Sequence, residues 1–228
     1  MTRGNKNRLA VFDCDGTIVD SQHAIIHAMR SAFARFDMPE PSHEAIRRLV
    51  GLPLEQAFAI LVPQQPATRY EELRTAYAIA WRKIQSDNII SEPLYPGLLA
   101  AIEALRQDGW WLGIATGKSR RGLDETLHRH GLSEYFVTLQ TADRASGKPH
   151  PQMLLQAMDE TGVHAEDTVM IGDTTYDMEM SRNARVRAIG VAWGYHGAAE
   201  LLAGGAEMVL NECSDITATL VQNRESKL

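Results

Sequence analysis

The spacing of hydrophobic positions divides the chain into two kinds of segment. A short apolar, β-prone run at residues 9–12 comes first. From residue 21 to about residue 88, apolar side chains recur at three- and four-residue steps, the period of helices with one buried face. From residue 96 onward, short β-prone runs alternate with helical segments, which favours a parallel sheet covered on both faces. The pattern therefore predicts an α/β protein with a helical segment inserted after its first strand.

Two apolar stripes mark the longest helices of the insert. They are Ile25, Met29, Ala32, Phe33 and Phe36 in the first, and Leu73, Ala76, Tyr77, Ala80, Trp81 and Ile84 in the second. Pro39 and Pro41 break the first helix. Ser42 is placed to cap a further helix that stops at Gly51. The stripes most simply pack on one another, which predicts a small helical bundle.

The alternating part predicts a Rossmann-like parallel sheet as the core domain, with the helical bundle as a cap domain. We expect strands at residues 109–115, 135–139, 168–171 and 186–192, and helices at residues 98–105, 119–130, 152–160, 176–183 and 214–221. The expected core domain comprises residues 1–19 and 94–228, and the expected cap domain residues 20–93. Because the two linkers, near residues 19–20 and 92–96, cross at neighbouring points, we expect the cap to rock as a lid over the sheet.

Composition and charge narrow the class of protein. The net charge of -6 disfavours general nucleic-acid binding, which usually needs a basic face, but it leaves small anionic substrates open. Cys14 and Cys213 form no CxxC motif, so we expect neither a disulfide framework nor a zinc site. Residues 1–8 are polar and basic, and no apolar stretch has the length of a membrane span. We therefore expect a cytoplasmic protein, as a monomer or a homodimer, that does not bind membranes.

Polar side chains gather at the predicted strand ends. They are Asp13 and Asp15 after the first strand, Thr116 after the second, Asp173 and Asp177 after the strand that ends at Ile171, and Lys148 in a loop before a helix. A parallel sheet brings the carboxyl ends of its strands to one edge, where ligands bind in such folds. We therefore expect these side chains to converge.

The chemistry of this set favours phosphoryl transfer. Several carboxylates at one point repel each other unless a cation is present, and oxygen ligands select a hard ion such as Mg²⁺. Lys148 and the metal would offset the charge of a phosphoryl group, while the Thr116 hydroxyl binds its oxygens. One carboxylate can act as nucleophile and form an aspartyl phosphate, and a second can transfer protons. Asp13 and Asp15 have a suitable spacing, and Gly16 lets the backbone approach phosphate.

The order of these motifs resembles a known family. Phe12-Asp13-Cys14-Asp15-Gly16-Thr17, Thr116-Gly117, Lys148-Pro149 and Gly172-Asp173 through Asp177 together resemble the haloacid dehalogenase superfamily. More narrowly, they resemble its phosphoglycolate phosphatase-like branch. The resemblance covers nearly the whole chain, because the helical insert lies where that branch carries its cap.

The resemblance implies a role for each core residue. Asp13 would be the nucleophile and a metal ligand, and Asp15 the acid/base, which also binds Mg²⁺ through its backbone carbonyl. Asp173 would complete the metal site, and Asp177 would support it. Phosphate binding is thereby implied for Gly16, Thr116, Gly117 and Lys148.

The resemblance also points to the cap segment at residues 47–53. It makes Arg48 and Gly51 candidates for substrate contact, and a lone arginine would suit a carboxylate or a second phosphate. Without the resemblance, Arg47 and Arg48 are more typical of a solvated helix face.

The sequence therefore predicts a Mg²⁺-dependent phosphatase acting on a small organic phosphomonoester. Phosphoglycolate is favoured by resemblance only, with sugar phosphates and nucleoside monophosphates as alternatives. A phosphomutase of the same fold and a non-catalytic phosphate-binding module stay open. Carbon–halogen and carbon–phosphorus hydrolases are disfavoured, since the resemblance implies that they lack an aspartate at the position of Asp15. Residues 116–119 resemble part of a P-loop but lack its preceding glycine, which argues against nucleotide binding by that route.

Overall fold

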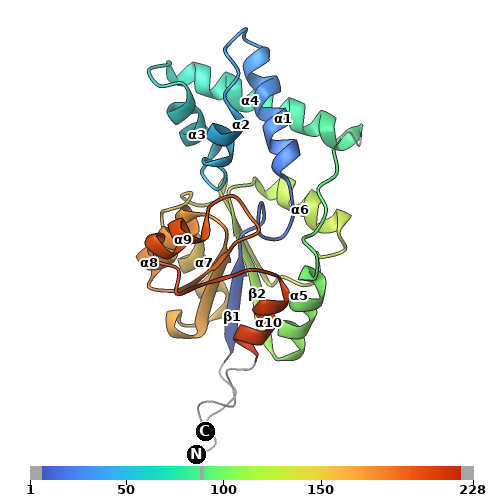
Figure 1. Ribbon diagram of the computed structural model, residues 1–228, viewed down its shortest axis with the longest axis vertical. Helices are drawn as coiled ribbons and strands as arrows, with labels where there is room; N and C mark the ends of the chain where they lie inside the picture. The colour runs from blue at the N-terminus through green and yellow to red at the C-terminus, as the bar shows by residue number, and fades with distance from the viewer. Residues whose placement is uncertain (1–6, 88–89, 222–228) are drawn as a thin grey trace, which may run out of the picture.

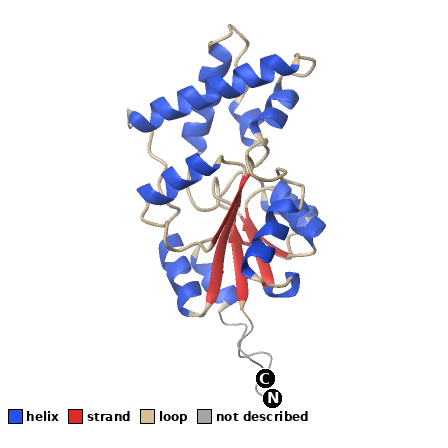
Figure 2. Ribbon diagram, turned by 180° about the vertical axis from the view of Figure 1, so that it is seen from behind, coloured by secondary structure: helices blue, strands red, loops and turns tan. Residues whose placement is uncertain are grey.

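The structure, a computed structural model, describes residues 7–87 and 90–221. A six-stranded parallel sheet has helices on both faces, and a separate group of helices lies beyond one end of the sheet (Figures 1 and 2). The strand order is β3-β2-β1-β4-β5-β6. This architecture confirms the predicted fold class, a Rossmann-like core domain with an inserted helical cap domain.

The bounds of the elements follow the chain. The strands are β1 (Arg8–Phe12), β2 (Trp110–Thr116), β3 (Thr138–Thr141), β4 (Thr168–Gly172), β5 (Arg187–Val191) and β6 (Met208–Leu210). The inserted helices are α1 (Gln22–Ala34), α2 (His43–Arg47), α3 (Leu54–Leu61) and α4 (Ala67–Ser86). Around the sheet lie α5 (Leu98–Gln107), α6 (Arg120–Arg129), α7 (Gln152–Thr161), α8 (Thr175–Ala184), α9 (Ala198–Gly204) and α10 (Ser214–Leu220), with a 3₁₀ turn η1 (Ala165–Asp167).

The central strand β1 is buried on both faces, which explains its continuous apolar sequence. Because successive side chains of a strand point to opposite faces, Ala10 and Phe12 pack with residues of α5, α6 and α10. Leu9 and Val11 pack on the other face with residues of α7 and α8. Burial on both sides fixes the register of β1 and thereby the position of the residues that follow it.

The inserted helices have hydrophobic clusters of their own. Phe33 of α1 and Phe58 of α3 are buried with their ring centroids 6.2 Å apart, in a cluster that also takes in Leu73 of α4. The Ser42 hydroxyl caps α2 by accepting a hydrogen bond from the backbone N–H of Ala45, as the sequence predicted. The inserted helices therefore pack around an apolar core of their own, as expected of a helical bundle.

The two linkers between the helical unit and the sheet run side by side. Val19 and Leu94 form an isolated antiparallel bridge. Around it, the Asp20 N–H donates to the Pro93 carbonyl at 2.9 Å, and the Tyr95 N–H donates to the Ile18 carbonyl at 3.2 Å. This pairing is compatible with a core domain of residues 1–19 and 94–228 and a cap domain of residues 20–93. It is also compatible with a lid motion of the cap, and both stay proposals.

Some predicted boundaries differ from the structure. The strand expected at residues 135–139 is β3 at Thr138–Thr141, because Tyr135 closes a turn onto the Leu132 carbonyl. Phe136 packs edge-on against Phe12 instead of joining the sheet, with ring centroids 6.4 Å apart. The short elements α9 and β6 were not predicted. Residues 1–6 of the basic N-terminus and residue 88 at the end of the helical pattern lie outside the described residues.

None of the helices among residues 7–87 and 90–221 is both long enough and apolar enough to cross a bilayer.

Candidate active site

Parallel register brings three strand ends to one edge of the sheet. Phe12, the last residue of β1, pairs with Ile114 of β2 and with Ile171 of β4. The N–H of the next residue, Asp13, still bonds to the Ile171 carbonyl at 2.9 Å. The polar residues predicted after these strands are therefore held by main-chain pairing at the end of the sheet that faces the helical cap.

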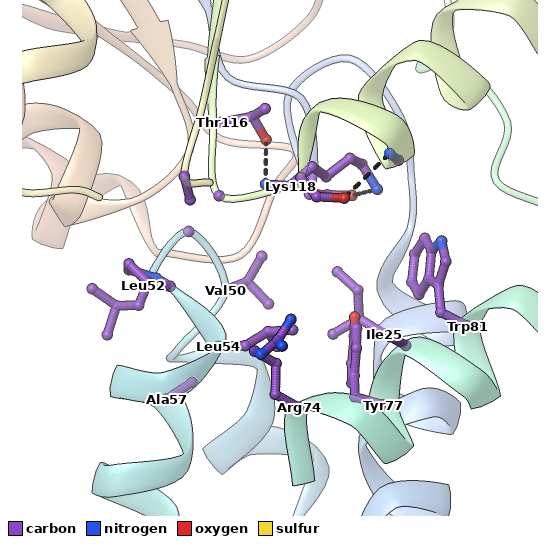
Figure 3. A pocket seen from close by; sticks show the side chains of 18 of the residues that line it. Ile25, Val50, Leu52, Leu54, Ala57, Arg74, Tyr77, Trp81, Thr116 and Lys118 are labelled. Carbon is purple, nitrogen blue, oxygen red and sulfur yellow. Dashed lines mark hydrogen bonds and ion pairs between the residues drawn. The ribbon is translucent and has the colours of Figure 1, made fainter. Parts of the chain in front are cut away.

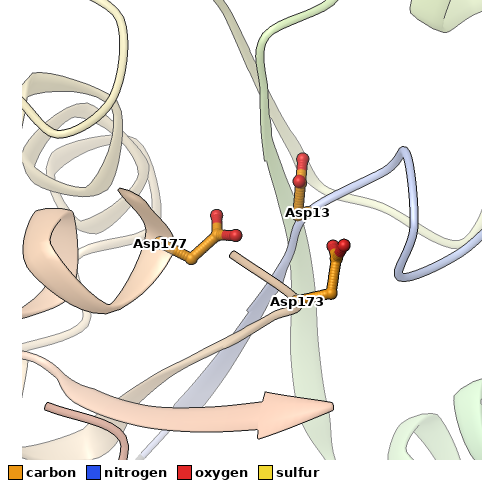
Figure 4. A group of neighbouring side chains, drawn as sticks. All are labelled: Asp13, Asp173 and Asp177. Atoms are coloured by element: carbon orange, nitrogen blue, oxygen red, sulfur yellow. The ribbon is translucent and has the colours of Figure 1, made fainter. Parts of the chain in front are cut away.

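Three buried carboxylates meet at this edge. Carboxylate oxygens of Asp13, Asp173 and Asp177 lie within 4.8 Å of one another (Figure 4). The Lys148 ammonium is 2.8 Å from Asp13 Oδ1 and 2.6 Å from Asp177 Oδ1, and its side chain has no exposed surface. The structure thus brings together the residues that the sequence placed after β1, after β4 and in the loop before α7.

Burial controls the electrostatics of the cluster. Desolvation raises the pKa of Asp13 to about 7, although Lys148 acts in the opposite direction. Desolvation, together with Asp13 and Asp177, raises the pKa of Asp173 well above its ordinary value. Burial alone would lower the pKa of Lys148, but the two neighbouring carboxylates raise it, so the ammonium stays charged. Three carboxylates share one ammonium, and a divalent cation would favour their charged forms by offsetting the excess of negative charge.

The hydrogen bonds of the carboxylates show which oxygens remain available. Asp13 Oδ1 accepts the Cys14 N–H, but the buried Asp13 Oδ2 has no hydrogen-bond partner among residues 7–87 and 90–221. Asp173 accepts the Thr17 hydroxyl on one oxygen and the Tyr195 N–H on the other. Asp177 Oδ2 accepts both the N–H and the hydroxyl of Thr174, as part of the capping box of α8. The set of oxygen donors and the unpartnered Asp13 oxygen fit a hard divalent cation.

Asp15 lies apart from the carboxylate cluster. Its Oδ1 accepts the Ser21 hydroxyl at 2.5 Å and is 2.8 Å from the Lys118 ammonium. Lys118 in turn lies over the Trp81 ring of α4, with Nζ 4.5 Å from the ring centroid. From the sequence, Lys118 is only part of a P-loop-like stretch, and its contacts with Asp15 and Trp81 were not predicted. Its place two residues after Thr116, at a strand end, was the available signal.

Glycines at this edge of the sheet allow neighbouring side chains and the cap backbone to lie close to the loops after the strands. Gly16 has a φ of +87°, and a Cβ there would overlap Asp173 Oδ2 and the Tyr195 ring. A Cβ on Gly117 would stand 3.1 Å from the Gly51 carbonyl oxygen of the cap. Thr116 is fully buried, and its Oγ1 accepts the Lys118 N–H at 3.2 Å. The cap loop at Gly51 therefore lies directly on the loop that follows Thr116.

A cavity of about 540 Å³ lies between the sheet edge and the cap (Figure 3). Asp13, Asp15, Thr116, Gly117 and Lys118 line its core end, and side chains of the inserted helices line the other end. Asp13 therefore connects the buried carboxylate cluster to a space that can hold a ligand.

Arg48 lies elsewhere than the resemblance implied. Its guanidinium pairs with Glu200 of α9 at 2.9 Å and with Glu44 at 3.7 Å, and it is not among the residues that line the cavity. Arg48 is the residue after α2, and Glu200 stands in the first turn of α9. The ion pair with Glu200 directs the Arg48 side chain toward α9. Gly51 does line the cavity. Two arginines of α4, Arg74 and Arg82, line the cavity and were not predicted, and Figure 3 shows Arg74 pointing into it.

Comparisons with known proteins agree with this geometry. Residues 10–191 match the family model of the haloacid dehalogenase-like hydrolases. The chain is 34% identical to the probable phosphatase IndB of Dickeya dadantii, over 91% of each protein. It is 27% identical to a phosphoglycolate phosphatase of Agrobacterium fabrum, over 100% of this chain and 98% of that one. A crystal structure of a haloacid dehalogenase-like hydrolase from Bacteroides fragilis superposes with a TM-score of 0.86 at 27% identity, covering 92% of this chain and 100% of the other.

Proposed function

We propose that this chain, which belongs to the haloacid dehalogenase-like hydrolase family, is a magnesium-dependent phosphatase of small organic phosphomonoesters. One observation carries the proposal. The Asp13 carboxylate stands at the floor of a cavity, beside the Lys148 ammonium and the Asp173 carboxylate, with one oxygen unpartnered among the described residues. The relatives named as phosphatases support the reaction class.

In this proposal Asp13 is the nucleophile. One of its carboxylate oxygens attacks phosphorus, the bond from phosphorus to the alcohol oxygen breaks, and Asp15 gives that oxygen a proton. Water then attacks the phosphorus of the aspartyl phosphate, Asp15 takes a proton from the water, and Asp13 is released as a carboxylate. Asp15 lines the same cavity as Asp13, which supports this division of roles.

The charge of the phosphoryl group requires compensation. Lys148 is held between Asp13 and Asp177 and supplies a fixed positive charge beside the attacking carboxylate. Thr116 and the backbone of Gly117 stand at the end of β2 beside Asp13 and are proposed to bind phosphoryl oxygens. Gly16 lets the loop after β1 pack closely against Asp173 and Tyr195, and its backbone is proposed to bind the phosphoryl group.

Asp13 and Asp173, with the backbone carbonyl of Asp15, are the proposed holders of Mg²⁺. A bound cation would offset the negative charge of the carboxylates and of the phosphoryl group. Asp177 is proposed to support the site indirectly, because its two oxygens already serve Lys148 and the capping box of α8.

Contact between cap and core supports exclusion of water during transfer. A Cβ on Gly147, in the loop before Lys148, would overlap the ring of Pro53, and the backbone of Gly51 lies on Gly117. The cap loop thus covers the sheet edge closely. Such covering keeps bulk water from the reacting group and is the usual task of a lid.

The test is phosphate release from a panel of metabolite phosphates with magnesium, with EDTA, and with Asp13→Asn as the control variant. We expect release with magnesium, none in EDTA, and a loss of at least about 10³-fold in the variant, since the nucleophile is removed. Release must occur without a bisphosphate activator, which a phosphomutase would need. Absence of turnover across the whole panel would contradict the proposal and favour a non-catalytic binding module. Full activity in EDTA would show that the reaction does not depend on magnesium.

A further inference from the structure

The two ends of the cavity differ in chemistry. At the core end, Asp13 presents a carboxylate. Thr116 and Lys118 present a hydroxyl and an ammonium at the same end (Figure 3). At the cap end the walls come from α1, from α3 and the loop before it, and from α4. They are mostly aliphatic and aromatic, and they include Ile25, Val50, Leu54, Tyr77 and Trp81. A ligand that fills the cavity therefore meets polar groups at one end and apolar surface at the other.

Tyr77 and Trp81 form one continuous wall. They lie one turn apart on the same face of α4, and their rings stack with centroids 5.9 Å apart at an interplanar angle of 17°. Figure 3 shows both side chains pointing from α4 toward the loop of Lys118. The Lys118 ammonium lies over the face of the Trp81 ring, so this wall is adjacent to the phosphate end of the site.

Apolar side chains outnumber the polar groups at the cap end, which are Glu55, Arg74, Arg82 and the Tyr77 hydroxyl. Arg82 Nε donates to the Ala78 carbonyl of its own helix. The Arg74 guanidinium points into the cavity, but Glu71 of the same helix already pairs with it through two hydrogen bonds. A sugar bound there would place hydroxyl groups against Ile25, Val50 and Leu54 without hydrogen-bond partners, which is costly. A two-carbon acid such as glycolate would leave most of a cavity of about 540 Å³ unfilled.

We propose that the substrate is a phosphomonoester of a bulky, largely apolar alcohol. This inference rests on the proposed phosphatase function and assigns its substrate class. The phosphoryl group lies at Asp13 and Thr116, and the alcohol part extends along Tyr77 and Trp81 toward Leu54. Hydrolysis consumes one water and yields the apolar alcohol and inorganic phosphate.

A series of alkyl phosphates tests this class directly. The substrates are ethyl phosphate, 2-phenylethyl phosphate, phosphoglycolate and glucose 6-phosphate, whose leaving groups are all alcohols of ordinary acidity. We expect kcat/KM for 2-phenylethyl phosphate to exceed that for ethyl phosphate by about 100-fold, because the added phenyl group would be buried against the apolar side chains of the cavity. A higher kcat/KM for phosphoglycolate or glucose 6-phosphate than for 2-phenylethyl phosphate would overturn the inference and leave the phosphatase function intact.

Two variants of the same helix locate the effect. Leu54 and Ile60 both lie on α3, but Leu54 lines the cavity and Ile60 is 57% exposed outside it. Leu54→Ser should lower the ratio of the two kcat/KM values, 2-phenylethyl over ethyl phosphate, by about 10-fold. Ile60→Ser should leave that ratio unchanged. An equal effect of both variants would refute the placement of the alcohol part.

Binding of phosphonates separates the inference from the proposed function. Calorimetry with magnesium present compares 2-phenylethylphosphonate with ethylphosphonate, neither of which can be hydrolysed as an ester. Tighter binding of the 2-phenylethyl compound, at least about 10-fold, supports the apolar subsite even if no ester is turned over. Equal binding of the two overturns the inference, whatever the panel of esters shows about catalysis.

Discussion

Lys148 has no exposed surface, yet its ammonium lies between the carboxylates of Asp13 and Asp177. A buried charge is tolerated only where opposite charges and hydrogen bonds replace water. Lys148 therefore has two tasks at once, because it neutralises part of a buried acidic cluster and it fixes the charge beside the proposed nucleophile. Stability and catalysis depend on the same side chain.

Replacement of this lysine tests its first task. We expect Lys148→Met to lower the free energy of unfolding in EDTA by about 3–5 kcal/mol, since buried carboxylates lose their cationic partner. Urea unfolding of both proteins measures the difference, with Lys83→Met, an exposed position at the end of α4, as the control. The control should change stability by less than about 0.5 kcal/mol. Equal stability of Lys148→Met and the parent protein would show that the cluster does not need the ammonium.

The convergence of these residues could be predicted from the sequence, whereas the direction of individual side chains could not. Asp13 and Asp173 each follow a buried strand directly, so the topology of a parallel sheet is enough to bring them together. The contact of Asp15 with Lys118, and the turn of Arg48 toward Glu200, depend on the rotamers of long side chains and on the seating of the cap. No pattern within one chain specifies those.

At the scale of elements, the linker that carries Glu92 joins three parts of the fold. The Glu92 side chain is buried, and its Oε2 accepts hydrogen bonds from Gln85 of α4 at 2.6 Å and from Arg129 of α6 at 2.9 Å. Arg129 also donates to the Gln85 side chain. The cap helix, the linker and a core helix are thus held by one polar cluster at the crossing point.

Removal of the arginine should weaken this junction. We expect Arg129→Ala to lower the free energy of unfolding by about 3 kcal/mol, because it leaves the buried Glu92 carboxylate without its cation. Arg121→Ala, on the same helix, removes an exposed pair with Glu125 and should cost less than about 0.5 kcal/mol. Urea denaturation of the two variants compares them. Similar losses in both would show that the linker cluster contributes no more than a surface ion pair.

Element boundaries follow the same division between local and tertiary causes. The start of α2 was predictable because Ser42 satisfies its own helix end locally. The start of β3 was not, because Tyr135 and Phe136 are β-prone residues that instead form a turn and pack on Phe12. Its actual residues, Thr138–Thr141, are largely polar and carry a weak strand pattern. The bounds of β3 are therefore set by its pairing with β2, which the local sequence does not specify.

At the scale of the whole molecule, the sheet edge and the cap share the proposed work. The sheet edge supplies the groups that act on phosphorus, and the cap supplies the surface that meets the alcohol part and closes the cavity. Two glycines of the core, Gly117 and Gly147, lie close to the cap loop at residues 51–53. Seating of the cap is therefore sensitive to a single added methyl group.

Gly147→Ala tests that seating. The new Cβ would overlap the Pro53 ring, so we expect the cap loop to lift and kcat/KM to fall by about 10-fold or more. Phosphate release and urea unfolding should be measured together, because the free energy of unfolding is expected to change by less than about 1 kcal/mol. Ser146→Ala, an exposed neighbour, serves as the control. Unchanged kcat/KM in Gly147→Ala would mean that closure onto this loop is not needed.

The central claim is that the phosphoryl group passes through Asp13 on its way to water. The most direct measurement is the configuration at phosphorus after hydrolysis of a chiral phosphorothioate ester in isotopically labelled water. Each in-line displacement inverts the phosphorus, so two successive displacements, first by Asp13 and then by water, give overall retention. Retention is the predicted result, and inversion, which requires direct attack by water, would contradict the account.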